Sequence, residues 1–125
     1  MNIDIRWDKQ RRDTLICEFN GDWTWHECRE AMQVMLYMQE GFGMEVNHIY
    51  DIRNSTLATR ACVKRMKKLL NIGLHPAPQQ IVIVDQDYRA GMLEAMLGNF
   101  TQPLGIEFVG SIPQARNVIY QQEAQ

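Results

Sequence analysis

Apolar and polar residues recur along the chain with two different periods, which mark the expected strands and helices. Alternation with a period of two predicts a half-buried strand over Ile3–Trp7, and the apolar run Leu15–Phe19 predicts a second strand that forms a hairpin with it. Apolar runs also predict strands over Val46–Ile52, Ile81–Val84 and Ile106–Val109. The unbroken β-branched run Ile81–Val84 is typical of a strand buried on both faces of a parallel sheet.

Helices are expected where apolar residues recur with the period of the α-helix. The four expected helices span about Thr24–Glu40, Thr59–Ile72, Tyr88–Phe100 and Ser111–Tyr120. Thr24 and Glu27 have the spacing of a capping box at the start of the first helix, and Gly41 and Gly43 provide a stop after about Glu40. The core face of this helix is predicted to consist of Trp25, Cys28, Ala31, Met32, Met35 and Leu36.

The order of these elements, β-β-α-β-α-β-α-β-α, predicts an α/β fold. Strands that alternate with helices need crossover connections, so we expect a mostly parallel sheet of about five strands with about four helices. The first strand is expected to be an antiparallel edge strand. The chain of 125 residues suits a single domain over 1–125, with a frayed polar tail at 121–125.

Composition and charge narrow the functional classes. Hydrophobic residues make up 46% and charged residues 22% of the chain, as in ordinary globular proteins. The net charge of −2 argues against nucleic acid as a partner, and no stretch approaches the ~20 apolar residues of a membrane span. The N-terminal residues lack the apolar core of a signal peptide, so we expect a cytoplasmic protein.

Few residues suggest catalysis, and we expect no enzyme, no cofactor and no metal site. Cys17, Cys28 and Cys62 lie in apolar segments and are expected to be buried free thiols, with Cys62 the nearest to cationic neighbours. His26 is expected on a wet helix face and His48 as a satisfied residue within a strand. A small enzyme that uses His75, His48 or a cysteine is the alternative.

Polar residues gather only where the predicted parallel strands end. The third predicted strand is followed by a candidate partner-docking or phosphorylation loop that contains Asp51, Arg53, Asn54, Ser55 and Thr56. Ligands of α/β sheets bind at this end of the strands. In the alternative interpretation, Ser55 and Thr56 only cap the helix that follows. A phosphorelay receiver is disfavoured because no acidic pair follows the first strand, and a nucleotide site because no glycine-rich phosphate loop is present.

Three further surfaces are candidates for binding. The basic face of the second expected helix contains Arg60, Lys64, Lys67 and Lys68, which predicts either a solvated face or docking of an acidic partner or an anionic membrane surface. A homodimer interface is predicted from the apolar excess at Val34, Tyr37 and Met38. A pocket between sheet and helices would be lined by Trp25, Tyr37, Tyr88 and Met92.

Several segments together resemble the STAS-like, or SpoIIAA-like, domains, whose founding members are anti-sigma-factor antagonists. The matching segments are Asp22–Trp25, Ile49–Ser55, Ile81–Val84 and Phe108–Val109 with Ser111–Arg116. The resemblance implies a non-enzymatic regulatory domain that binds proteins, with some relatives that bind small molecules or lipids. It also implies a phosphorylated serine, for which Ser55 is the nearest positional match and Thr56 the second, although Asn54–Leu57 replaces the usual Asp-Ser-Ser-Gly.

These observations leave two main hypotheses. The first is a cytoplasmic regulatory domain that docks a protein partner through the loop Asp51–Thr56 and the basic helix face. The second is a module that binds a small molecule or lipid in a pocket between the sheet and the helices.

Overall fold

Five strands and two helices have defined bounds in the structure, a computed structural model that describes residues 2–43, 45–56, 61–62, 64–65, 68, 80–85 and 106–123. The elements are β1 (Ile3–Trp7), β2 (Thr14–Gly21), α1 (Trp25–Phe42), β3 (Asn47–Ser55), β4 (Ile81–Val84), β5 (Ile106–Val109) and α4 (Ile112–Glu123). Each predicted strand is therefore present.

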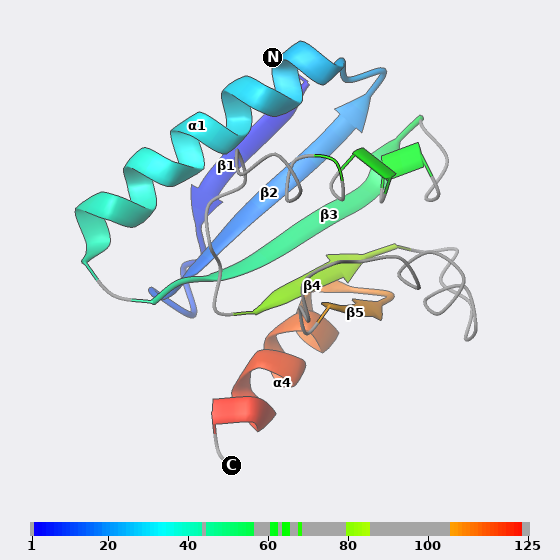
Figure 1. Cartoon of the computed structure of the whole chain (residues 1–125). Helices are drawn as coiled ribbons and strands as arrows, with labels where there is room; N and C mark the ends of the chain where they lie inside the picture. The colour runs from blue at the N-terminus through cyan, green and yellow to red at the C-terminus, as the bar shows by residue number, and fades with distance from the viewer. Residues whose placement is uncertain are drawn as a thin grey trace.

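The strands form one mixed sheet in the order β1-β2-β3-β4-β5 (Figure 1). The edge strand β1 pairs antiparallel with β2, with Ile5 opposite Cys17, and the remaining neighbours are parallel. The prediction of a mostly parallel sheet with an N-terminal antiparallel edge strand is confirmed.

Two strands extend further than their apolar runs. β2 continues to Gly21 and β3 to Ser55, because Asn20 pairs with Asn54 and Gly21 with Ser55 beyond an irregularity after Glu18. The polar segment Arg53–Ser55, expected as a loop, is thus strand backbone at the carboxyl edge of the sheet. This pairing fixes the loop residues relative to β2.

Helix α1 covers one face of the sheet, and α4 lies on the other (Figure 1). The capping box of α1 is present: Glu27 N–H donates to the Thr24 hydroxyl at 3.1 Å, and Thr24 N–H donates to the Glu27 carboxylate at 3.1 Å. The helix continues through Gly41, expected as a stop, and ends at Phe42. Its C-cap is Gly43, whose φ of 74° lies in the left-handed region that favours glycine.

The core on the α1 side combines aromatic and sulfur-containing side chains, including Phe19, Trp23 and Met32. One predicted member of this core is wrong: Leu36 is 42% exposed, and Trp25 is half-buried. Both lie at the flank of the buried arc formed by Cys28, Ala31, Met32 and Met35, so helical spacing alone overestimated the width of the core face.

Of the two remaining predicted helices, the structure describes one in part and none of the residues of the other. Of the expected helix Thr59–Ile72, the structure describes residues 61, 62, 64, 65 and 68, and all of them are helical. The expected helix Tyr88–Phe100 lies outside the described residues. At the other end of the chain, α4 continues through Glu123, so residues 121–123 of the expected tail are helical.

Two buried polar groups of the sheet, Asp8 and His48, are hydrogen-bonded to neighbouring side chains. Arg116 on α4 holds Asp8, at the end of β1, through two hydrogen bonds of 2.9 Å. On the other face, the His48 ring contacts the Tyr50 hydroxyl at 2.8 Å and the Gln39 amide oxygen at 3.0 Å, so His48 is a satisfied buried residue as predicted. Within the described part of the chain, no helix is long and apolar enough to span a membrane.

Candidate functional site

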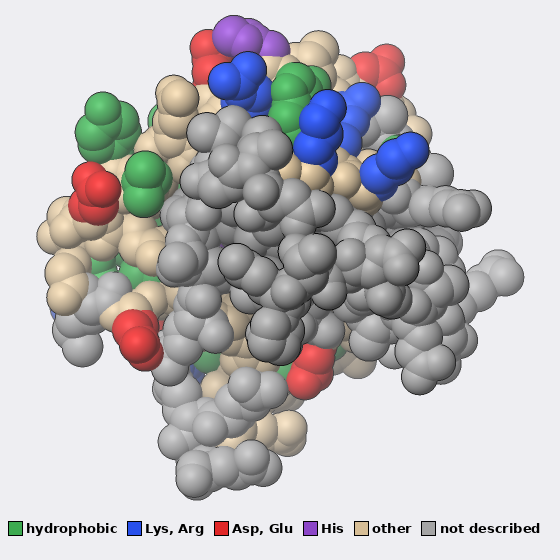
Figure 2. Space-filling model, in the orientation of Figure 1, with side chains coloured by type: hydrophobic (Ala, Val, Ile, Leu, Met, Phe, Trp, Pro, Cys, Tyr) green, Lys and Arg blue, Asp and Glu red, His purple; other side chains and the backbone are tan. Residues whose placement is uncertain are grey.

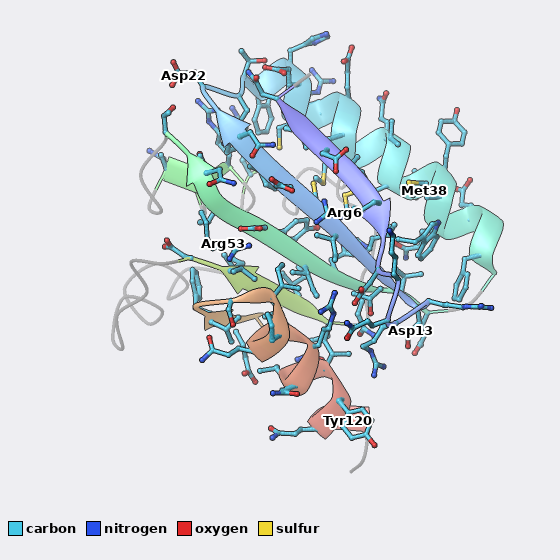
Figure 3. The ribbon with its side chains drawn as sticks, turned by 180° about the vertical axis from the view of Figure 1, so that it is seen from behind. Arg6, Asp13, Asp22, Met38, Arg53 and Tyr120 are labelled. Atoms are coloured by element: carbon cyan, nitrogen blue, oxygen red, sulfur yellow. The ribbon has the colours of Figure 1, made fainter. Side chains whose placement is uncertain are left out.

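The carboxyl edge of β3 begins with an ion pair. Arg53 donates to the Asp51 carboxylate through Nε at 2.9 Å and through a terminal nitrogen at 2.8 Å. Asp51 is buried, and the Arg53 side chain is 29% exposed. Seen from behind in Figure 3, Arg53 and Arg6 project from the face of the sheet opposite α1. The ion pair therefore lies within β3, before its last residues pair with β2.

Ser55 is held against the core side of the same edge. The Trp23 indole N–H donates to the Ser55 hydroxyl at 2.8 Å, and the Ser55 oxygen lies 3.7 Å from the Cys62 sulfur. Trp23 itself is buried, whereas Ser55 is half-buried. The hydroxyl predicted as the phosphorylation site is therefore engaged inside the fold.

Asn54 and Thr56 are the exposed residues of this loop. Thr56 N–H donates to the Gly21 carbonyl at 3.0 Å, and the Thr56 hydroxyl donates to Asp22. Asp22 lies where β2 ends, at the opposite end of the sheet from Asp13 (Figure 3). The backbone of the loop is thus fixed by β2, while these two side chains face solvent.

A group of cations borders this edge, and we refer to Arg29, Lys64, Arg65 and Lys68 as the cationic patch. The Arg65 guanidinium lies 4.7 Å from the Trp23 ring centre and donates to the Trp23 carbonyl at 3.0 Å. The Lys68 ammonium lies 4.9 Å from the Trp25 ring centre, and Arg29 follows Trp25 by one turn of α1. Figure 2 shows Lys and Arg side chains gathered at the top of the molecule.

The predicted basic helix face is described in part. Lys64 and Lys68 are exposed, as expected, while Arg60 and Lys67 lie outside the described residues. Sequence reasoning missed the role of Arg65 and of Trp23. No local sequence pattern joins Trp23 with Arg65, since their contact spans 42 residues.

The three cysteines are free and buried, as predicted. Burial raises the pKa of Cys28 to about 12 and also raises the pKa of Cys62, although the hydrogen bond with Ser55 and the charge of Arg65 oppose it there. These groups are therefore protonated thiols at neutral pH rather than nucleophilic thiolates. His26 is exposed and pairs with Glu30 at 2.9 Å, and His75 lies outside the described residues.

The residues predicted to line a pocket are not brought together where they are described. Trp25 is half-buried under Lys68 at the start of α1, while Tyr37 is 77% exposed further along the helix. Tyr88 and Met92 lie outside the described residues. Of the predicted homodimer residues, Val34 is 43% exposed and Met38 packs partly against the core.

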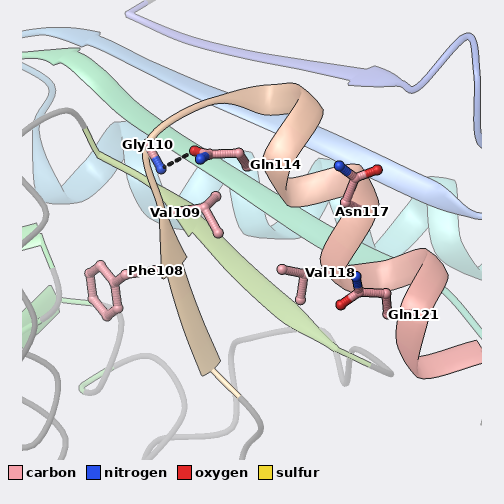
Figure 4. A pocket seen from close by; sticks show the side chains of 7 residues that line it. All are labelled: Phe108, Val109, Gly110, Gln114, Asn117, Val118 and Gln121. Carbon is pink, nitrogen blue, oxygen red and sulfur yellow. Dashed lines mark hydrogen bonds between the residues drawn. The ribbon is translucent and has the colours of Figure 1, made fainter.

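A cleft lies elsewhere, between β5 and α4 (Figure 4). Its volume is about 330 Å³, and it is lined by Phe108, Val109, Gly110, Gln114, Asn117, Val118 and Gln121. Gly110 N–H donates to the Gln114 side chain at 2.9 Å at one end of the cleft. Among the described residues, no group of three or more His, Cys, Asp or Glu side chains could hold a metal ion.

Comparison with solved structures identifies the fold. The chain is similar to an uncharacterized protein of the DUF3478 family from Shewanella loihica PV-4, described as having a SpoIIAA-like fold. The two share 19% sequence identity and a TM-score of 0.59 over 93% of this chain and 90% of that one. No protein-family model matches the chain, and no curated protein matches it either. The protein is thus an α/β domain with a SpoIIAA-like fold.

Proposed function

We propose that this protein is a non-enzymatic cytoplasmic regulatory domain that docks a protein partner at the carboxyl edge of its sheet, over the loop Asp51–Thr56. The proposal rests on the contrast between side chains of this loop that are held by neighbouring residues and side chains that are exposed. Asp51 and Ser55 are held by Arg53 and Trp23, whereas the neighbouring Asn54 and Thr56 are exposed. A fixed backbone with exposed side chains loses little conformational entropy when a partner binds.

The fold supports the same conclusion. STAS-like domains, which the chain resembles, are expected to act by binding proteins. The strands run in the unbroken order β1-β2-β3-β4-β5. The crevice that holds ligands in doubly wound sheets forms where the strand order reverses, and the order here contains no reversal among the described strands. Without such a crevice among the described strands, the exposed carboxyl edge is better suited to bind a protein surface than a small substrate.

Phosphorylation of the loop is the proposed regulation, with Ser55 as the acceptor and Thr56 as the second candidate. The Ser55 hydroxyl accepts the Trp23 indole N–H inside the fold. A phosphate on this oxygen adds charge and bulk, so it would displace the contact with Trp23 and rearrange the loop. A kinase could in this way change the docking surface at the end of β3.

The test is photo-crosslinking from a single position of the loop. A benzophenone amino acid in place of Asn54 is expected to capture a protein from a lysate of the source cells, and Ser55→Asp in the same chain should reduce the adduct. The same group in place of Lys9, which is exposed at the other end of the sheet, is the matched control. Equal adducts from both positions, or none from position 54, would refute the proposal.

A module that binds a small molecule is the second candidate, favoured by the cleft between β5 and α4. Native mass spectrometry of the purified chain is expected to show a copurified ligand if this is its function. Gln114→Leu and Asn117→Leu would then abolish the adduct, since these side chains supply the polar lining. Retention of the mass shift in both variants would exclude this cleft.

A further inference from the structure

The described cations differ in whether a carboxylate forms an ion pair with them. Arg6, Arg11, Arg53 and Arg116 each form an ion pair with a carboxylate, at 2.8–3.4 Å. No Asp or Glu among the described residues forms an ion pair with the members of the cationic patch, Arg29, Lys64, Arg65 and Lys68. Within the described part of the chain, the patch therefore brings four positive charges together without a paired carboxylate, although the net charge of the chain is −2.

Two members of the patch are also held in place. Arg65 and Lys68 lie over the Trp23 and Trp25 rings, at 4.7 Å and 4.9 Å from the ring centres. Such contacts restrict long side chains that would otherwise sample many rotamers. Because these cations are ordered before binding, pairing them with a carboxylate costs less entropy than pairing freely moving surface lysines.

We infer that the cationic patch binds an acidic segment of the protein partner, as part of the docking surface at the carboxyl edge. This inference rests on the proposed function and adds the chemistry of the partner. The patch borders the exposed Asn54 and Thr56 through the contacts of Arg65 and Ser55 with Trp23. A partner on the loop would therefore lie beside Arg65, the member of the patch that shares Trp23 with Ser55.

The size of the patch favours a short acidic segment over an extended polyanion. Electrostatic interactions at physiological ionic strength decay over about 8 Å, so a short segment experiences mainly the local positive potential. A membrane or a nucleic acid would extend beyond the patch and meet the remainder of a chain with net charge −2. A membrane-binding face also needs apolar side chains that insert, whereas Trp25 is half-buried beneath Lys68.

The probe for this inference is a short fluorescein-labelled peptide of alternating Glu and Ser, with binding measured by fluorescence anisotropy. The charge-reversal variant Lys64→Glu/Lys68→Glu is expected to weaken binding at least about tenfold, and added salt should weaken binding to the unmodified chain. The matched control is Lys9→Glu/Arg12→Glu, which changes the net charge equally at exposed residues of the opposite edge and should alter affinity less than about twofold. Circular dichroism confirms that both variants fold.

Two results would overturn the inference: equal weakening by both variants, which indicates a response to net charge alone, and no binding of the peptide to the unmodified chain. Vesicles containing phosphatidylserine and a single-stranded oligonucleotide are tested in parallel. Tighter patch-dependent binding of either would replace the acidic segment with that class of partner. If the crosslink from position 54 persists while the peptide fails to bind, docking of a partner at the carboxyl edge is supported and the proposed acidic segment of that partner is refuted.

Discussion

A buried ion pair between an aspartate and an arginine lies at each end of the strands, and the two pairs have different structural effects. At each edge, a buried aspartate accepts two hydrogen bonds from one arginine: Asp8 from Arg116, and Asp51 from Arg53. The first pair joins residues 108 positions apart and ties α4 to the end of β1, while the second joins residues two positions apart in β3. The first ion pair therefore connects two elements of the fold, whereas the second acts within a single strand.

This difference assigns the two edges distinct roles. The ion pair of Asp8 with Arg116 joins two elements, and removing it should loosen the fold. At the carboxyl edge, the ion pair of Asp51 with Arg53 lies within β3, beside the exposed Asn54 and Thr56, which is the arrangement expected of a binding surface. Variants that remove equivalent groups from the two edges measure how far the roles differ.

The largest effect is expected from Arg116→Ala. This change leaves the Asp8 carboxylate, whose side chain is 1% exposed, buried without its partner. Removing one member of a buried ion pair costs roughly 3 kcal/mol, measured as the free energy of unfolding in urea. The matched change Arg53→Ala should cost about 1–2 kcal/mol, because it releases no second element, while the two ion pairs are otherwise similarly buried. Equal losses would contradict the division between the edges.

The next effect is a dependence on acid pH. Burial by itself raises the pKa of Asp8, but hydrogen bonds from Arg116 and Gln10 and the nearby positive charges outweigh it, so the pKa is lowered. The contribution of the Asp8 carboxylate to stability is therefore present above its unfolded pKa of about 3.9 and is lost as the pH falls through the lower folded value. Asp8→Asn should be less stable at neutral pH and should lose less stability on acidification. Parallel curves for the two proteins would show that Asp8 contributes nothing there.

A smaller effect is expected from the contact between Trp23 and Ser55. Trp23→Phe removes the indole N–H donor, and Ser55→Ala removes the acceptor, each at a cost of about 1 kcal/mol. In a double-mutant cycle, the two changes should cost less together than the sum of their separate costs, since they remove the same hydrogen bond. Additive costs would show that the two side chains act independently. Replacing either side chain is also expected to alter the crosslink from position 54.

The smallest effect concerns the exposed apolar residues of α1. Tyr37→Ser should change the free energy of unfolding by less than about 0.5 kcal/mol, because Tyr37 is 77% exposed. If Val34, Tyr37 and Met38 form the proposed homodimer interface, light scattering should report a dimer that Met38→Glu weakens. A monomer at all concentrations would remove this interface.

Hydrophobic periodicity predicted most of the described fold, because the relevant signals are local. The strands, the capping box at Thr24 and the helix stop before Gly43 follow from neighbouring residues. The strand order and the extension of β3 to Ser55 did not follow, since they depend on pairing of polar backbone with β2. The predicted burial of Leu36 was wrong because helical spacing does not indicate how wide the opposing surface of the sheet is.

The strand pattern predicted where the candidate site lies, but not the contacts that shape it. The carboxyl end of β3 is where any parallel sheet gathers polar residues, so Asp51–Thr56 could be chosen from the strand pattern. The contacts that define the loop join residues distant in sequence: Trp23 with Ser55 across 32 positions and with Arg65 across 42. Periodicity and motif spacing contain no information about such contacts.

The most direct test of the binding surface is a nitrogen-15 NMR titration of the whole chain with the peptide of alternating Glu and Ser. Docking at the carboxyl edge predicts the largest amide shift changes at Asn54, Thr56 and Lys68, with little change at Lys9 and Arg12. The largest changes at residues 9–12, or along the cleft beside α4, would contradict it.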